Sequence, residues 1–331
     1  MKGERNMRST AYSDIISKFS MSGKPEGPFD PNVQKFKELV RYALEMAFND
    51  FNFRTLTKTE AFKKEYAAWE ESEKAIRKQQ NADERNPEPK MTAYLIKRLD
   101  ECGFLAKFVD YFKASSRDKT AFDDWHKKTC KLFLHILDGA GDFEKYTKAY
   151  TGLAYGKAQK IVNMMFKHLY CLAGANAYEE HFRHCHMVLD NFTLEWFKRE
   201  TGKKRIDSWS NLVYRDQSAD HNDYMFYQDN IRIHFRNADS SNFEYKDLTP
   251  FLAEFYIWPE IQLHLAAESF IFELNPDKYK GKGTGPAHAR EAIIKLPVDK
   301  LIEQAANEIR EYENKQKKHK AHPDAPGWAF S

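Results

Sequence analysis

The chain has 331 residues, of which 52 are Lys or Arg and 49 are Asp or Glu, so its formal net charge is only +3. With 42% hydrophobic and 31% charged residues, it has the composition of a globular protein with one large core or two packed lobes. No apolar run approaches the roughly 20 residues that cross a bilayer, and the N-terminus has no signal-peptide pattern. The four cysteines form no CxxC pair, which argues against a disulfide framework. We therefore expect a cytoplasmic protein without a membrane partner.

The first part of the chain predicts a flexible N-terminal arm followed by a helical lobe. The arm, residues 1–31, is polar and rich in turn-forming residues. The sequence DPN at 30–32 favours a helix start, and apolar residues then recur at spacings of three and four. Helices are expected over 33–51, within the charged stretch 58–90, over 91–115 with a break at Gly103, and over 122–137. They form the expected N-terminal lobe, 32–140.

The second part of the chain also predicts helices, with few strand-like alternations and no internal repeat. A helix is expected over 251–274, interrupted at Pro259, and another over 297–320. The glycine-rich stretch 278–288 is expected to be a loop. It lacks the strand and the GK[ST] ending of a phosphate-binding loop, so no nucleotide cofactor is expected. The fold class predicted is mainly α, with a central region 141–275 and a C-terminal region 276–331 that comprises a loop, a helix and a tail.

The central region contains a predicted helix-hairpin-helix. One helical run ends in the turn TGLAYGKA, and a longer run begins with Lys157 and Lys160. Gly152 and Gly156 would let backbone N–H groups approach a phosphate, which the N-terminus of the second helix also attracts. The hairpin therefore predicts a contact with a phosphate backbone. A glycine-capped helical hairpin with solvated lysines is the alternative for the same residues.

A single carboxylate, Asp190, follows the hairpin. It comes after the apolar run MVL and before NFTLEWF, which is expected to be a helix. Asp is a preferred helix N-cap. A carboxylate at that place can also stabilise a developing sugar cation or help a nucleophile to attack C1′. Asp190 is therefore the candidate catalytic residue.

The segment from Gly141 to Trp196 resembles the helix-hairpin-helix DNA glycosylases of the endonuclease III and 8-oxoguanine glycosylase type. The sequence AQKIVN, with Lys160 and Asn163, matches the helix after that family's hairpin, and MVLDNFTLEW matches the approach to its catalytic Asp. The hairpin differs from the common LPGVG type, and the Lys-to-Asp separation is longer than in the best-known members. No Cys cluster for an iron–sulfur centre follows.

The resemblance implies a two-lobed helical architecture and a DNA glycosylase. Such an enzyme hydrolyses the N-glycosidic bond of a damaged or modified base and leaves an abasic site. Asp190 would be its catalytic carboxylate. Lys160, with Lys157 as the substitute, would be the Schiff-base nucleophile of an additional abasic-site lyase step. The resemblance implies no cofactor. The expected setting is DNA repair, or defence against phage DNA that carries modified bases, and we expect a monomer.

The residues after Asp190 are consistent with binding to nucleic acid. The run KRETGKKR, 198–205, holds five basic residues and one acidic residue, and Lys203, Lys204 and Arg205 are the candidate phosphate contacts. Aromatic residues and arginines alternate over 208–236. Enzymes that act on a base extrude it into an aromatic pocket, for which Trp209 and Tyr214 are the candidates. A solvated loop followed by core aromatics is the alternative for the same pattern.

Other functions fit parts of the sequence. A non-catalytic helix-hairpin-helix DNA-binding protein needs the hairpin but no base pocket, and a helical interaction protein needs neither. A group of histidines and cysteines lies between His168 and His186, but its spacing matches no zinc pattern. No metal is therefore expected.

Overall fold

The computed structural model shows a mainly α-helical protein, and the residues that it describes contain no β-strand. Described are residues 13–15, 27–49, 60–79, 91–115, 118–138, 155–206, 208–215, 221–237, 245, 247–279 and 284–321. Within these ranges, no helix is long and apolar enough to span a membrane. The mainly α fold class is thereby confirmed.

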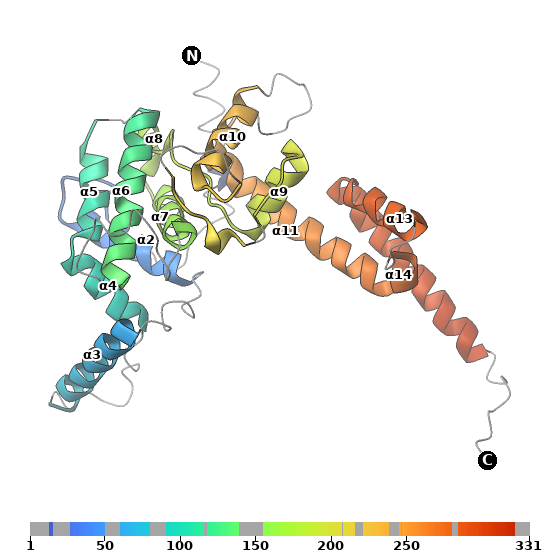
Figure 1. The fold of residues 1–331 in the computed structure, drawn as a ribbon, viewed down its shortest axis with the longest axis horizontal. Coiled ribbons are helices and arrows are strands. Elements are labelled where there is room, and N and C mark those ends of the chain that lie inside the picture. The colour runs from blue at the N-terminus through green and yellow to red at the C-terminus, as the bar shows by residue number, and fades with distance from the viewer. Residues whose placement is uncertain are drawn as a thin grey trace. The chain divides into compact units, whose positions relative to one another are not determined.

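Figure 1 shows the helices coloured in chain order. Their bounds are α2 Lys35–Asn49, α3 Glu60–Gln79, α4 Met91–Glu101, α5 Phe104–Lys113, α6 Lys119–Asp138, α7 Tyr155–Tyr170, η3 Ala175–Tyr178, α8 Glu179–Phe182, α9 Asn191–Thr201, η4 Trp209–Asn211, α10 Tyr224–Arg236, α11 Pro250–Leu274, α12 Pro276–Tyr279, α13 Thr284–Ile294 and α14 Val298–Ala321.

The first helices follow the apolar spacing of the sequence. α2 buries the whole stripe from Phe36 to Phe48, whereas Val33 lies before the helix and is 37% exposed. Gly103 separates α4 from α5 and has a φ of 78°. This left-handed conformation is open to glycine at little cost, which explains the break between the two helices.

Two segments differ from the expectation. α11 is continuous with Pro259 inside it, so the predicted interruption was wrong. Proline removes one N–H donor, whereas Phe251, Leu252 and their neighbours in α11 gain from burial, and packing outweighs the lost hydrogen bond. α13 begins at Thr284, inside the stretch expected to be a loop. Its proline stands in the first turn, where the missing N–H needs no intrahelical partner.

The chain divides into two compact units, Met1–Phe255 and Tyr256–Ser331. The division falls within α11. Helices α6 and α7, on either side of the expected boundary near residue 140, pack together in the first unit.

α7 lies at the centre of the first unit, where α2, α6 and η4 pack against it (Figure 1). Aromatic rings from α5, α6 and α7 fill the adjoining core. The ring of Phe166 lies 5.3 Å from that of Phe108 and 5.2 Å from that of Tyr111, measured between centroids. Tilted and edge-on ring pairs at this separation each contribute about 0.5–1.5 kcal/mol beyond their buried area. This packing fixes the helix that carries the site described below.

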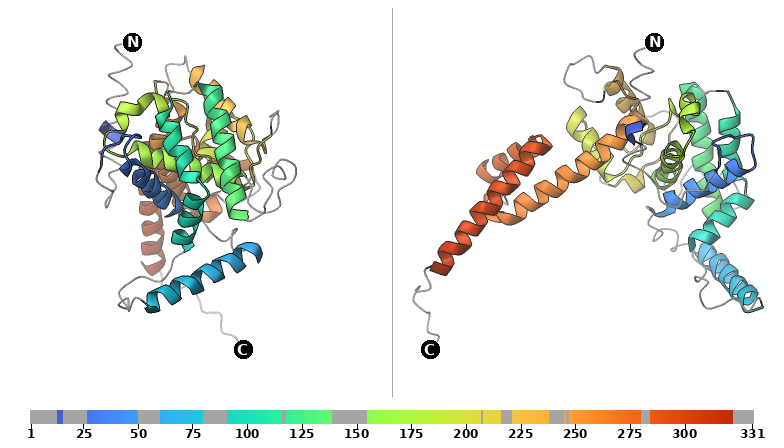
Figure 2. Two further views of the ribbon diagram at one scale, coloured as in Figure 1. Left: turned by 90° about the vertical axis from the view of Figure 1, so that its left-hand side faces the viewer. Right: turned by 180° about the vertical axis from the view of Figure 1, so that it is seen from behind.

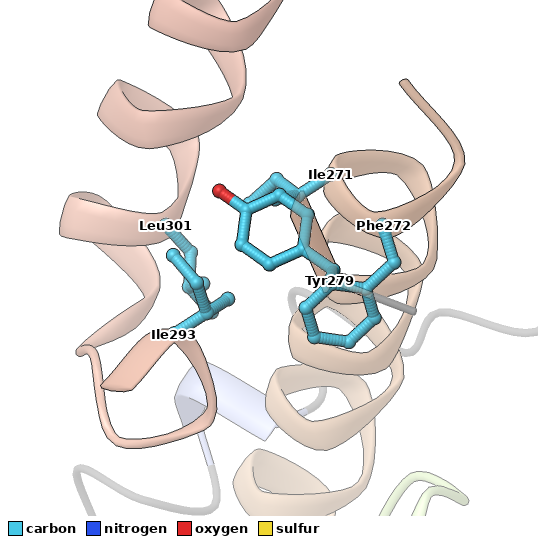
Figure 3. Packing of buried hydrophobic residues seen from close by; sticks show 5 residues of the cluster. All are labelled: Ile271, Phe272, Tyr279, Ile293 and Leu301. Carbon is cyan, nitrogen blue, oxygen red and sulfur yellow. The ribbon is translucent and has the colours of Figure 1, made fainter. Parts of the chain in front are cut away.

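The second unit has a small core of its own. Ile271 and Phe272 of α11 pack with Tyr279, Ile293 and Leu301 (Figure 3). Beyond this cluster, the C-terminal half of α14 extends past the other helices of the unit (Figure 2). Every residue from 309 to 317 is exposed.

A buried carboxylate also stabilises the second unit. Glu308 is fully buried and accepts hydrogen bonds from Lys278 Nζ at 2.7 Å, Tyr279 Oη at 2.5 Å and Gln304 Nε2 at 2.9 Å. Asn275 donates a further bond. These donors lower the pKa of Glu308 against the opposing effect of burial, so the carboxylate is held as an internal acceptor that joins α14 to α12 and to the residue before it.

Candidate catalytic site

Lys160 and Asp190 lie side by side. Lys160 stands on α7 and Asp190 is the N-cap of α9, and Lys160 Nζ lies 3.7 Å from Asp190 Oδ2. Their side chains are 16% and 8% exposed, respectively. The two residues that the sequence proposed for catalysis are therefore brought together from separate helices.

The two carboxylate oxygens of Asp190 face different partners. Oδ1 accepts hydrogen bonds from the backbone N–H groups of Phe192 at 2.9 Å and Thr193 at 3.2 Å. Thr193 Oγ1 in turn accepts from the Asp190 N–H at 2.9 Å, which completes a capping box. Oδ2 is the oxygen nearest to Lys160. Asp190 thus caps α9 with one oxygen and presents the other to the lysine.

The approach to Asp190 is an extended, buried segment, Met187–Asp190, whose backbone is hydrogen bonded by side chains. Gln228 Nε2 donates to Met187 O at 2.8 Å, and Glu254 Oε2 accepts from Val188 N at 3.3 Å. Thr193 Oγ1 donates to Val188 O at 2.7 Å. Gln159 pairs with both backbone groups of the residue before Asp190. Buried polar backbone groups need such partners, and here four helices supply them.

Lys157 joins the pair from one turn earlier in α7. The ammonium nitrogens of Lys157 and Lys160 lie 4.9 Å and 5.0 Å from the centroid of the Trp209 ring. Burial lowers the pKa of Lys157, and the charge of Lys160 lowers it further. Trp209 therefore contacts both lysines of the site as a cation–π partner.

Gly156 has a different role from the one expected. Its N–H donates to Leu212 O at 3.0 Å, so that group is already bonded within the protein. A Cβ at this position would lie only 2.0 Å from the carbonyl oxygen of Trp209. The glycine allows η4 to pack directly on α7. The Gly156 N–H, which was expected to bind a phosphate, is instead bonded to Leu212. Gly152 lies outside the described residues.

The Tyr214 ring packs beside Tyr155, the first residue of α7. Its ring centroid is 5.0 Å from that of Tyr155, and Lys127 Nζ lies 4.9 Å from the ring. Trp209 and Tyr214, the two rings expected to form a base pocket, therefore contact the same end of α7. Trp209 does so at the lysine pair and Tyr214 at Tyr155.

The basic run after α9 returns toward Asp190. Lys203 and Lys204 are exposed, and Lys203 Nζ donates to Asn230. Arg205 pairs with Glu195 at 3.3 Å and donates from Nη1 to the carbonyl oxygen of Asn191 at 3.5 Å. Asn191 directly follows Asp190, so Arg205 contacts the first turn of α9.

Two histidines of the group between His168 and His186 bond to different parts of the protein. His181 Nε2 is bonded to Ala114 O, whereas His186 lies between Tyr224 and Asp123. Within the described ranges, no three His, Cys, Asp or Glu side chains are arranged to hold a metal ion.

A buried polar network behind the site was not anticipated from the sequence. Asn163 donates to Gln159 Oε1 and to Tyr224 Oη, each at 3.0 Å, and its Oδ1 lies 2.9 Å from His126 Nε2. Burial lowers the pKa of His126 well below its ordinary value, so that ring is neutral. The available signal was the recurrence of amide side chains four residues apart on the face of α7 that also carries apolar residues.

Comparisons with protein-family models, with curated proteins and with solved structures gave no match to this chain.

Proposed function

We propose that this protein is a DNA glycosylase that hydrolyses the N-glycosidic bond of a damaged or modified base and leaves an abasic site. The observation that supports the proposal is the 3.7 Å approach of Lys160 Nζ to Asp190 Oδ2, on two helices that hold both groups in place. Such pairing of an amine with a carboxylate is what the resemblance to helix-hairpin-helix glycosylases implied. The role would be repair, or removal of modified bases from phage DNA.

In the proposed reaction, the base leaves with the electron pair of the C1′–N bond and takes up a proton. The sugar becomes cationic at C1′, and Asp190 Oδ2 stabilises this charge at short range. Water then adds to C1′ and loses a proton, which completes hydrolysis. Because Oδ1 is held by the cap of α9, the carboxylate keeps its orientation as the charge develops.

Lys160 gives the site a second reaction. As a neutral amine it can attack C1′ in place of water and expel the base, which takes up a proton as in hydrolysis. The new C1′–N group then loses a proton while the C1′–O4′ bond breaks and O4′ takes one up, which yields a Schiff base with the opened sugar. Elimination of the 3′ phosphate would then cut the strand. Lys157 lies at the same ring of Trp209, and its lowered pKa favours the neutral amine. It is therefore the alternative nucleophile.

DNA would reach this site through the cations around it. Lys160 lies beside Asp190, Lys157 faces the same Trp209 ring, and Arg205 contacts the residue after Asp190. The exposed Lys203 and Lys204 precede Arg205 in the chain. Phosphates bind such groups independently of sequence. The chemistry at Asp190 would then select the base.

The test uses single strands and duplexes that carry assorted modified bases. After incubation, alkali breaks DNA at abasic sites, and the parent protein should produce such breaks. Asp190→Asn keeps a capping oxygen but loses the charge, so single-turnover excision should fall by about 100-fold or more while DNA affinity persists. Excision at the parental rate in this variant would contradict the assignment. DNA binding without abasic sites on any substrate would indicate a non-catalytic binder.

Borohydride distinguishes the two reactions in the same assay. A Schiff base is reduced to a stable covalent adduct, which the parent should form and Lys160→Gln should lose. An adduct that survives in Lys160→Gln shifts the nucleophile to Lys157 or to another amine. Excision without an adduct shows a hydrolase in which Lys160 shapes the site.

A further inference from the structure

We propose that Gln159 is the positioning residue for Asp190, because its amide joins the Asp190 segment to the helix that carries Lys160. Gln159 Nε2 donates to Leu189 O at 2.7 Å, and Gln159 Oε1 accepts from Leu189 N at 3.2 Å. The inference rests on the proposed catalytic role of Asp190. Gln159 acts through the backbone, and it holds Asp190 Oδ2 in position against Lys160.

The paired amide replaces a neighbouring strand. In a β-ladder, one residue exchanges two backbone hydrogen bonds with its partner, and here a side-chain amide offers the same donor and acceptor to Leu189. Gln159 is fully buried, as is Leu189. Water cannot reach the backbone N–H and C=O of Leu189 to replace the amide. Loss of the Gln159 amide therefore leaves both backbone groups of Leu189 without a hydrogen bond.

The orientation of the Gln159 amide is fixed by its other bonds. Its Nε2 also donates to Gly156 O at 3.0 Å, and its Oε1 also accepts from Asn163 Nδ2 at 3.0 Å. A flipped amide would place its donors against Asn163 Nδ2 and Leu189 N, and its oxygen against the carbonyl oxygens of Gly156 and Leu189. The amide therefore has one arrangement, and that arrangement matches Leu189.

Neutral histidines support this arrangement from behind. Asn163 Oδ1 accepts from His126 Nε2, which leaves His126 Nδ1 to accept from Tyr155 Oη at 3.0 Å. Asn163 also donates to Tyr224 Oη, whose proton then goes to His186 Nδ1 at 2.8 Å. The two N–H groups of the Asn163 amide thus go to Gln159 Oε1 and Tyr224 Oη. The network thus holds Asn163, and through it Gln159, in one orientation.

Gln159 differs from the other residues that hold the segment. Gln228 on α10 and Glu254 on α11 bind Met187 and Val188, and neither helix carries a member of the catalytic pair. Gln159 adjoins Lys160 on α7 and binds the residue before Asp190. It therefore sets the separation of the amine and the carboxylate, whereas Gln228 and Glu254 only fix the segment in the core.

Two substitutions of the same kind test this distinction. Gln159→Met and Gln228→Met each replace a buried glutamine that bonds to the Met187–Asp190 segment with an apolar side chain of similar length. Displacement of a reacting group by about 1 Å costs on the order of 100-fold in rate. We expect Gln159→Met to lower kcat for excision at least tenfold more than Gln228→Met, with KM changed less than twofold in both. Equal losses of kcat would overturn the proposal.

A second measurement does not depend on glycosylase activity. Acetic anhydride modifies lysine amines, and mass spectrometry reports the rate at each lysine. An amine held against a carboxylate reacts slowly, so Asp190→Asn should speed acetylation of Lys160. Gln159→Met should approach that faster rate, and Gln228→Met should keep the parental rate. If the parent excises no base, the proposed function fails while this comparison still decides the role of Gln159. Parental acetylation in Gln159→Met would overturn it.

Gln159→Glu covers the case in which Gln159→Met does not fold. The carboxylate keeps an acceptor for Leu189 N but loses the donor to Leu189 O, and protonation of the acid restores that donor. Relative to the parent, its kcat and its Lys160 acetylation should therefore return toward parental values as the pH falls. A ratio that does not change with pH would count against positioning by the amide.

Discussion

At the scale of single residues, Gly156 shows how one position links the helix to the rings of the site. Its missing side chain lets the carbonyl of Trp209 approach α7, and its N–H is bonded to Leu212. The same contact places the Trp209 ring where both lysine ammonium groups face it. The glycine therefore positions the cations of the site indirectly, through close packing of η4.

Gly156→Ala should be strongly destabilising. The new Cβ would lie 2.0 Å from a backbone oxygen, so η4 must move away from α7. Overpacking of this kind costs about 1–3 kcal/mol, which urea unfolding would measure as a lower midpoint at unchanged slope. Gly202→Ala is the control, because its Cβ meets no atom within 4 Å and only the φ of 66° opposes it. That strain costs about 1–2 kcal/mol. A smaller loss in Gly156→Ala than in Gly202→Ala would contradict the packing role.

At the scale of elements, the apolar spacing predicted α2, α4, α5 and α6, because each helix buries one stripe of its own residues. The capping role of Asp190 was also predictable, since the cap forms within α9 itself. The burial of Gln159 and Asn163 was not. It depends on Met187–Asp190, a segment far away in sequence that packs on α7 and needs those amides. Local patterns do not contain that information.

The buried histidines of these elements should make stability depend on pH. Burial, with Arg232 nearby, lowers the pKa of His186 to about 4, and burial with Lys167 does the same for His168. In the unfolded chain, histidine titrates near 6.5. Between these two pKa values the unfolded state binds more protons than the folded state. The free energy of unfolding therefore has its full value above about pH 6.5 and falls as the pH drops toward about 4. The slope should be about 1.4 kcal/mol per pH unit for each such histidine.

Urea unfolding across this pH range measures the effect. His168→Phe removes one titrating ring, so the free energy of unfolding should fall less steeply with pH, by about 1.4 kcal/mol per pH unit. The substitution should cost little at neutral pH, because the buried Nε2 of His168 has no hydrogen-bond partner among the described residues. Stability that stays constant from about pH 7 to about pH 4.5 would show that the buried rings do not titrate on unfolding.

At the scale of the whole molecule, the near balance of 52 basic and 49 acidic residues limits how DNA can be bound. A net charge of +3 gives little general attraction, so affinity must come from local groups of cations. Two short groups are candidates: Lys160 beside Asp190 with Lys157 on the same Trp209 ring, and the exposed Lys203 and Lys204, which precede Arg205. Binding should therefore weaken steeply with salt and depend on few residues.

Joint replacement of Lys203 and Lys204 with Gln should weaken binding to all DNA sequences alike. Each phosphate contact on duplex DNA contributes about 0.9 to the slope of log affinity against log salt, so the pair should flatten the slope by up to about 1.8. Arg205 is kept, because its pairing with Glu195 also supports α9. The control replaces Lys295 and Lys300 of the second unit with Gln. Their side chains are 72% and 59% exposed, and their replacement removes the same amount of charge. If both double variants shift the slope equally, net charge rather than this surface governs binding, and the DNA interface must lie elsewhere.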